Sequence, residues 1–214
     1  MHVIAFQTAR LIIRQLRDDD APTLASYRSD PQVARFLSWA MPYSQQRASE
    51  LINRHLGRDF DHPGESGLNL AVVRTDTQEL IGDAHIRHEG NDPRQGVIGY
   101  VFAREVHGNG YATELARGMI ARFFSTPAAH RIAAYCDARN TASARVLEKA
   151  GMRHEATFVQ GAFARDRWVD EHAFGLLRSE WLRQQSHEHL PAPACRKCQS
   201  ARNAAFAADA PVLG

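Results

Sequence analysis

The segment from residue 96 to residue 124 limits the possible folds more than any other part of this sequence. Residues 96–103 are apolar and rich in β-branched and aromatic side chains, which is typical of a strand. Gly108 and Gly110 follow, and over residues 111–124 the apolar side chains recur at the i, i+3, i+4, i+7 spacing of an amphipathic helix. The pattern predicts a strand, a glycine turn and a helix in direct succession.

This glycine turn is a candidate diphosphate-binding loop. The first turn of a helix has backbone N–H groups without intrahelical partners, and the helix dipole adds positive potential there. Glycine has no Cβ, so Gly108 and Gly110 would let the backbone curl closely around an anion, although both could also be ordinary turn residues. A dinucleotide fingerprint is excluded because Thr113 stands where a third glycine is needed, and a nucleoside-triphosphate loop is excluded because it needs a lysine.

The remaining pattern predicts a mixed α/β (α+β) fold of helices on a sheet. Further strands are expected over residues 10–16, 69–74, 80–87, 131–136, 156–163 and 169–177. Further helices are expected from about residue 18, over residues 44–60, and from Asn140 to Gly151. Strands and helices interleave as far as Trp181, which favours a layered domain.

Composition narrows the class of function. The chain has 214 residues with 26 basic and 24 acidic side chains, and its net charge of +2 lacks the basic concentration of a nucleic-acid binder. No apolar stretch approaches the ~20 residues that cross a bilayer, and no signal-peptide pattern is found. Three cysteines do not make a disulfide framework. We therefore expect no nucleic-acid partner, no membrane partner and a cytoplasmic location.

Residues 186–214 differ in character from the rest of the chain. They are rich in alanine, proline and small polar residues without a sustained apolar period, which predicts a disordered C-terminal tail. An alternative is a metal site, because this segment contains four residues of the types that bind zinc: His187, His189, Cys195 and Cys198.

A second segment with candidate chemistry begins at Asn140. Asparagine is a good helix N-cap, and Ser143 then lies in the first turn of the helix. On a helix Ser143 shares a face with Leu147 and Ala150, so its side chain would point toward the interior or a cleft. Short hydroxyls also favour helix starts for purely local reasons.

With both segments in view, the chain resembles the GNAT N-acetyltransferase superfamily, and most closely its ribosomal-protein N-terminal (RimJ/RimL-type) branch. The resemblance covers about residues 8–184, which form the predicted N-acetyltransferase domain. It is carried, in order, by Thr8-Ala-Arg-Leu-Ile-Ile-Arg14, Gly108-Asn-Gly-Tyr-Ala-Thr-Glu114, Asn140-x-x-Ser143 with Leu147-Glu-Lys-Ala-Gly151, and residues 168–181.

The resemblance implies a six- to seven-stranded, mixed and mostly antiparallel sheet flanked by helices, in which the central parallel strands 97–103 and 131–136 splay apart. Acetyl-CoA, as the co-substrate, would place its pantetheine arm in this gap, against main-chain groups near Tyr100, Val101 and Phe102 and beside Asn140. No metal is expected. The diphosphate would rest on the amides of His107, Gly108, Asn109, Gly110, Tyr111 and Ala112.

The resemblance also implies the chemistry. The acetyl group would move to a primary amine, either a protein N-terminus or a small molecule, by direct attack in a ternary complex. Ser143 would stabilise or protonate the departing thiolate, because Leu147 stands where many members carry a tyrosine. A main-chain N–H around Val101 or Phe102 would polarise the carbonyl.

The general base, the amine acceptor and the oligomeric state stay open, and a homodimer is allowed. A water chain could serve as the base, and His85 is the best individual candidate because imidazole titrates near neutrality. The other candidates are the carboxylates Asp83, Glu105, Asp137, Asp170 and Glu171. Two other functions also stay open: a non-catalytic acyl-CoA-binding or sensing module on the same fold, and a nucleotide-binding module.

Overall fold

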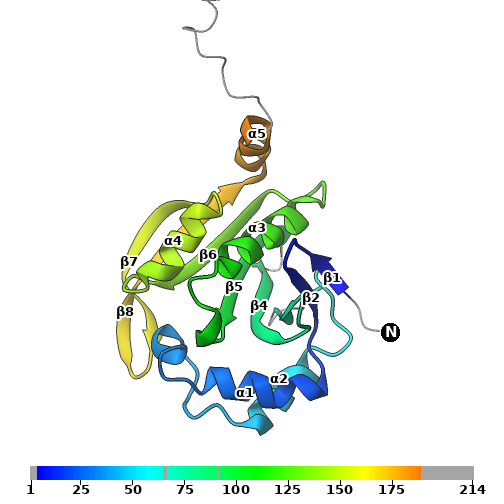
Figure 1. Ribbon diagram of the computed structural model, residues 1–214. Helices are drawn as coiled ribbons and strands as arrows, with labels where there is room; N and C mark the ends of the chain where they lie inside the picture. Colours follow the sequence, from blue (N-terminus) through cyan, green and yellow to red (C-terminus); the bar gives the residue numbers. More distant parts are fainter. Residues whose placement is uncertain (1–3, 65–66, 91, 189–214) are drawn as a thin grey trace, which may run out of the picture. The chain divides into compact units, whose positions relative to one another are not determined.

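The computed structural model describes residues 4–64, 67–90 and 92–188 (Figure 1). The chain divides into two compact units, Met1–Trp181 and Leu182–Gly214. The predicted tail lies almost wholly outside the described residues, as do three of its candidate zinc ligands, His189, Cys195 and Cys198, and the side chain of the fourth, His187. No helix in the described ranges has the length and apolarity that crossing a bilayer requires.

In the described part of the first unit, eight strands form one sheet in the order β1-β2-β3-β4-β5-β6-β8-β7. Neighbouring strands are antiparallel except β5 and β6, which are parallel, so the predicted mixed and mostly antiparallel sheet is confirmed. The extra strand is β1, which is too short to show a periodic pattern. The strands are β1 Ile4–Gln7, β2 Leu11–Gln15, β3 Leu68–Arg74, β4 Leu80–Glu89, β5 Asp92–Phe102, β6 Arg131–Asp137, β7 Arg153–Ala164 and β8 Arg167–Leu177.

Within the described ranges, five α-helices accompany the strands. They are α1 Ala21–Arg28, α2 Gln45–Arg54, α3 Tyr111–Phe124, α4 Thr141–Lys149 and α5 Arg178–Glu188. Helix α2 begins where Ser44 accepts a hydrogen bond from the N–H of Arg47, and it ends earlier than the predicted residue 60. The chain turns there through Gly57, which has a left-handed φ of 75°. Helix α5 was not predicted, because its polar sequence has no apolar period.

The two faces of the sheet carry separate apolar cores. Side chains alternate along β5, so Ile98 and Phe102 pack in one cluster with Met119 of α3, whereas Val101 packs against a second cluster that contains Leu24 of α1. Helices α3 and α4 therefore cover one face, and α1 and α2 cover the other (Figure 1).

The parallel strands β5 and β6 diverge, as the resemblance implied. Their pairing is confined to Gln95, Gly96 and Val97 of β5, opposite 131–133 of β6. Strand β5 nevertheless continues to Phe102 and β6 to Asp137. Beyond Val97, one edge of β5 thus runs on without a neighbouring strand from the described residues.

Candidate functional site

The glycine loop between β5 and α3 has a backbone that requires glycine. Gly108 and Gly110 both have a φ of 81°, in the left-handed region that costs other residues strain. A Cβ at Gly108 would meet nothing within 4 Å, and one at Gly110 would meet only the Arg10 guanidinium, at 3.6 Å from Nη2. Backbone conformation, and not crowding by the protein, is therefore what selects glycine here.

The N–H groups of this loop are the largest set of unused donors at the site. The first helical hydrogen bond of α3 runs from Glu114 N to Gly110 O at 3.1 Å. The six N–H groups of residues 108–113 donate to no acceptor in the described part of the chain. The N–H of His107 donates to Arg104 O at 3.1 Å, so the free run begins one residue later than the predicted set and extends to Thr113.

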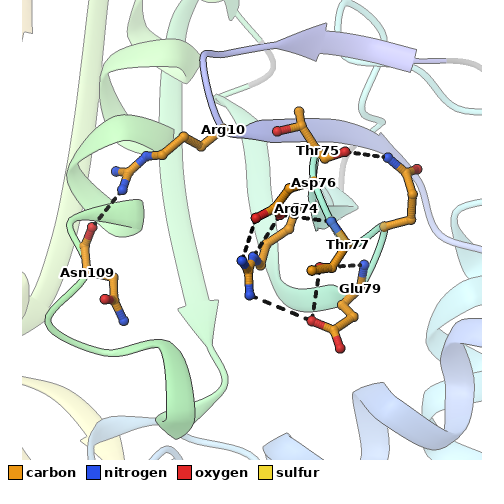
Figure 2. A network of polar contacts seen from close by, with 8 residues as sticks. Arg10, Arg74, Thr75, Asp76, Thr77, Glu79 and Asn109 are labelled. Atoms are coloured by element: carbon orange, nitrogen blue, oxygen red, sulfur yellow. Dashed lines mark hydrogen bonds and ion pairs between the residues drawn. The ribbon is translucent and has the colours of Figure 1, made fainter.

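One side chain at this loop escaped the sequence analysis. Arg10, between β1 and β2, donates from Nη1 to the carbonyl of Asn109 at 3.1 Å (Figure 2). Its guanidinium lies 4.5 Å from the ring centroid of Tyr111. The only signal in the sequence is the Thr8-Ala-Arg-Leu motif, which carries no information about a partner 99 residues away.

The direction of main-chain groups along β5 decides which residues face the gap toward β6. Just beyond the end of β5, the N–H of Ala103 donates to the carbonyl of Ile81 in β4. Near the start of β5, the carbonyl of Arg94 accepts from the N–H of His130, on the side of β6. Because these directions alternate along a strand, Val101 faces β4, opposite Asp83, whereas Tyr100 and Phe102 face the gap. The carbonyl of Phe102 there lies 3.1 Å from His107 Nε2, which tethers the glycine loop to the strand.

Ser143 lies where the second segment predicts it, in the first turn of α4. Its N–H donates to Asn140 Oδ1 at 3.1 Å, which confirms Asn140 as the N-cap. Its hydroxyl lies 3.1 Å from the hydroxyl of Tyr100, which also donates to the Ser143 carbonyl at 3.4 Å. Burial raises the pKa of Tyr100, so its side chain is a neutral phenol near pH 7. Leu147 is a core residue, 1% exposed.

Comparison with known proteins identifies this arrangement. A family model described as an acetyltransferase (GNAT) domain matches residues 10–153. The uncharacterized N-acetyltransferase YnaD of Bacillus subtilis is 29% identical over 184 residues, covering 85% of this chain and 99% of that protein. A GNAT-family acetyltransferase structure from Bacillus anthracis has a TM-score of 0.71 at 26% identity, covering 84% of this chain and 99% of the other.

The chain belongs to the GNAT acetyltransferase family. The predicted N-acetyltransferase class is thereby confirmed, and with it acetyl-CoA-dependent N-acetylation as the general reaction. RimL, a ribosomal-protein alpha-N-protein acetyltransferase in complex with coenzyme A, has a TM-score of 0.69 at 15% identity, covering 82% of this chain and 98% of that one. At this identity the likeness concerns the fold, and the RimJ/RimL-type branch stays a prediction.

Two of the candidate bases in this GNAT acetyltransferase are held by fixed donors. Asp83 is 1% exposed and accepts hydrogen bonds from Tyr27 at 2.7 Å and Arg28 at 2.5 Å. Asp137 pairs with Arg139, and hydrogen bonds from Arg139 lower the pKa of Asp137. Both carboxylates therefore have structural partners within the fold.

The other candidate bases have diverse surroundings. Burial lowers the pKa of His85, whose Nδ1 lies 3.3 Å from Asn69 Oδ1, and burial raises the pKa of Glu171. Glu105 is exposed in a short 3-10 turn, and Asp170 accepts from the N–H of Gln160 at 2.8 Å. Within the described ranges, no group of three or more His, Cys, Asp or Glu side chains could hold a metal ion.

Proposed function

We propose that this acetyltransferase holds the diphosphate of acetyl-CoA on the amides of residues 108–113 and transfers the acetyl group to a primary amine by direct attack in a ternary complex. The observation that carries the proposal is the run of six N–H groups that have no acceptor among the described residues, just beyond an edge of β5 that pairs with no described strand. An extended, amide-bearing arm can pair along such an edge while its anionic end meets the helix N-terminus.

Each predicted cofactor-binding residue has a place in this proposal. Gly108, Asn109, Gly110, Tyr111 and Ala112 supply loop amides, Thr113 joins them, and His107 supports the loop through Phe102. The main-chain groups of Tyr100 and Phe102 pair with the arm, whereas those of Val101 are directed to β4.

Asn140 completes the set that would hold the arm. Its side-chain oxygen caps α4, and its amide NH₂ has no hydrogen-bond acceptor among the described residues. Such a donor could bind a carbonyl of the pantetheine arm without disturbing the cap.

The chemistry needs an unprotonated amine, stabilisation of the carbonyl oxygen and a proton for the sulfur. The amine nitrogen forms a bond to the acetyl carbon as the carbon–sulfur bond breaks. The N–H of Tyr100 or Phe102 stabilises the developing negative charge on the oxygen. Ser143 donates its hydroxyl proton to the departing thiolate, and the proton that the attacking amine nitrogen loses passes to water, from which Ser143 is reprotonated. The phenol of Tyr100 hydrogen-bonds with the Ser143 hydroxyl, and Leu147 stands where many family members carry a helix tyrosine.

The position proposed for the sulfur also has Cys136 nearby. In the RimL structure coenzyme A forms a disulfide with a cysteine of that protein. Here Cys136 is a free cysteine, buried at the end of β6. Burial raises the pKa of Cys136 to about 11, so it is a neutral thiol that does not compete as a nucleophile.

A thiol-release assay with an amine panel tests this function. The full-length chain, acetyl-CoA and one amine are mixed, with an N-terminal serine or alanine peptide, a polyamine, a free amino acid or an aminoglycoside as the amine. We expect coenzyme A release that depends on one class of amine, with intersecting lines in double-reciprocal plots, as a ternary complex requires. Acetyl-CoA binding without release by any amine would instead support the non-catalytic sensing module.

Three further properties belong to the same proposal. Membership of the RimJ/RimL-type branch predicts that the peptide is the best acceptor in the panel. A cytoplasmic location and a homodimer are predicted as well, and cell fractionation and sedimentation would test them. Thermal protection by ATP rather than by coenzyme A would overturn the acetyl-CoA site and favour a nucleotide-binding module.

A further inference from the structure

The Thr8–Arg10 segment is fastened to the start of α3 by a single carboxylate. Glu114 Oε1 accepts from the hydroxyl of Thr8 at 2.6 Å and from the N–H of Arg10 at 2.8 Å. Glu114 Oε2 accepts from Nε of Arg10 at 2.7 Å. Three donors from one short segment thus converge on one side chain in the first turn of α3.

The charge of Glu114 has the wrong sign for a helix start that is to receive a diphosphate. Partial burial opposes its ionisation, yet the hydrogen bonds from Thr8 and Arg10 lower the pKa of Glu114, so it is a carboxylate at neutral pH. A carboxylate beside a bound phosphate is repulsive unless a cation neutralises it. Arg10 is the cation in contact, with an exposed side chain beside a largely buried Glu114.

The second contact of Arg10 fixes a peptide unit of the loop. Arg10 Nη1 donates to the carbonyl of Asn109, and the N–H of Gly110 belongs to the same peptide plane. In a trans peptide the carbonyl and the N–H point in opposite directions. A guanidinium that holds the Asn109 carbonyl on one side therefore aims the Gly110 N–H toward the other side.

The geometry points to Arg10 as a positioning residue for the diphosphate of acetyl-CoA, an inference that rests on the proposed function. The planar fork of Arg10 binds Glu114 and Asn109 at once, neutralising the carboxylate and aligning a loop amide before the ligand arrives. The ring of Tyr111 packs against the guanidinium, at 4.5 Å from its centroid, and keeps it in this orientation. The Thr8-Ala-Arg-Leu motif thereby acquires a function at a site about a hundred residues away.

Arg10→Met and Arg10→Lys test this role. Lysine keeps the charge but cannot hold both partners in a planar fork. We expect both variants to raise the KM for acetyl-CoA about tenfold with kcat within about twofold, because a preorganising contact is lost and the reacting groups are untouched. With acetyl-pantetheine, which has no diphosphate, kcat/KM of the variants should equal that of the unchanged protein.

Arg74→Met is the matched control. Arg74 is a neighbouring arginine in Figure 2, but its partners Asp76 and Glu79 lie in its own turn, so its loss should leave the KM for acetyl-CoA unchanged. Wild-type KM in Arg10→Met would overturn the inference, and so would an equal loss with acetyl-pantetheine, which would indicate general damage to the fold. An unchanged KM for acetyl-CoA in Arg10→Lys would show that a positive charge is sufficient, and it would overturn the role of the planar guanidinium. Failure of the unchanged protein to use acetyl-CoA would instead refute the proposed function.

Discussion

The glycine loop and the buried cluster around Asp83 differ in whether their hydrogen-bonding groups have partners. We define the Asp83 cluster as Tyr27, Arg28, Asn69 and Asp83. In the loop, six donors have no acceptor in the described part of the chain. In the cluster, one buried carboxylate accepts from two groups at each oxygen: Tyr27 and Arg28 at Oδ1, and Arg28 and Asn69 at Oδ2. Unused hydrogen-bonding capacity marks a place for a ligand, whereas a saturated group stabilises the fold.

The largest effect is expected from breaking the saturated cluster. Arg28→Leu would leave the carboxylate of Asp83 buried without its cation, and loss of one partner of a buried pair costs about 3–5 kcal/mol of the free energy of unfolding. Arg94→Leu is the control, because its pair with Asp92 has an exposed arginine and should contribute little to the free energy of unfolding. Urea denaturation measures the free energy of unfolding of both variants. Equal decreases would contradict the claim that the Asp83 cluster stabilises the fold more than the surface pair does.

The next largest effect concerns the open loop. Gly110→Val should weaken acetyl-CoA binding at least about a hundredfold, about 2.7 kcal/mol, because valine cannot adopt the left-handed φ that shapes the donors. Gly90→Val is matched, since Gly90 also has a positive φ and open space around its Cβ position. Calorimetric titration should show the loss only at Gly110, with the circular dichroism spectrum retained; unchanged binding would refute the diphosphate loop.

A third test concerns polar groups that lack a hydrogen-bond partner but are buried, and it measures their effect on the free energy of unfolding. His55 is 6% exposed, and neither ring nitrogen has a hydrogen-bond partner among the described residues. Burial, reinforced by the charge of Arg58, lowers the pKa of His55 to about 4. Between pH 7 and pH 4 the unfolded chain therefore binds a proton that the folded chain does not, so stability falls as the pH falls.

The His55 contribution can be isolated with one substitution. Taking the ordinary histidine pKa of about 6.5 for the unfolded chain, acidification from pH 7.5 to pH 5 should cost about 2 kcal/mol through His55. His55→Leu should flatten this part of the curve of unfolding free energy against pH. An unaltered slope in His55→Leu would contradict the assignment.

The smallest effect is expected at the proposed acid. Ser143→Ala should lower kcat about tenfold with little change in acetyl-CoA affinity, because the hydroxyl acts on the departing sulfur. Tyr100→Phe should give a similar loss, and the double variant should add little, since the two hydroxyls form one contact. Ser125→Ala, at the end of α3, is the control. Turnover at saturating substrate that equals that of the unchanged protein would remove Ser143 from the mechanism.

Local patterns in the sequence predicted the parts of the site that depend on neighbouring residues. The strand–glycine–helix succession and the Asn140 cap are such parts, because turn and cap preferences act over a few residues. The hydrogen bonds that Asp83 accepts come from Tyr27 and Arg28, more than fifty residues earlier. Because local patterns do not show these donors, Asp83 remained a candidate base in the sequence analysis. Contacts between distant segments are invisible to periodicity.

The direction of main-chain groups along β5 was unpredictable for a different reason. Whether Val101 or its neighbours face the gap depends on the register against β4, and a shift by one residue would reverse the answer. The side-chain alternation of residues 96–103 shows only which faces of the sheet are apolar. The family resemblance therefore implied only that the pantetheine arm lies near Tyr100, Val101 and Phe102. The β4–β5 pairing shows which of these three residues direct their main-chain groups toward the gap.

Among the described residues, the parallel ladder between β5 and β6 joins β1–β5 to β6–β8 through three residue pairs. In the proposed complex the arm of acetyl-CoA would lengthen this narrow connection and so act as a structural member of the sheet. A ligand that binds only the folded state raises the free energy of unfolding by RT ln(1 + [L]/Kd), which is about 2.7 kcal/mol at a hundredfold excess over Kd. The concentration of acetyl-CoA would then affect the stability of the folded enzyme as well as its rate of turnover.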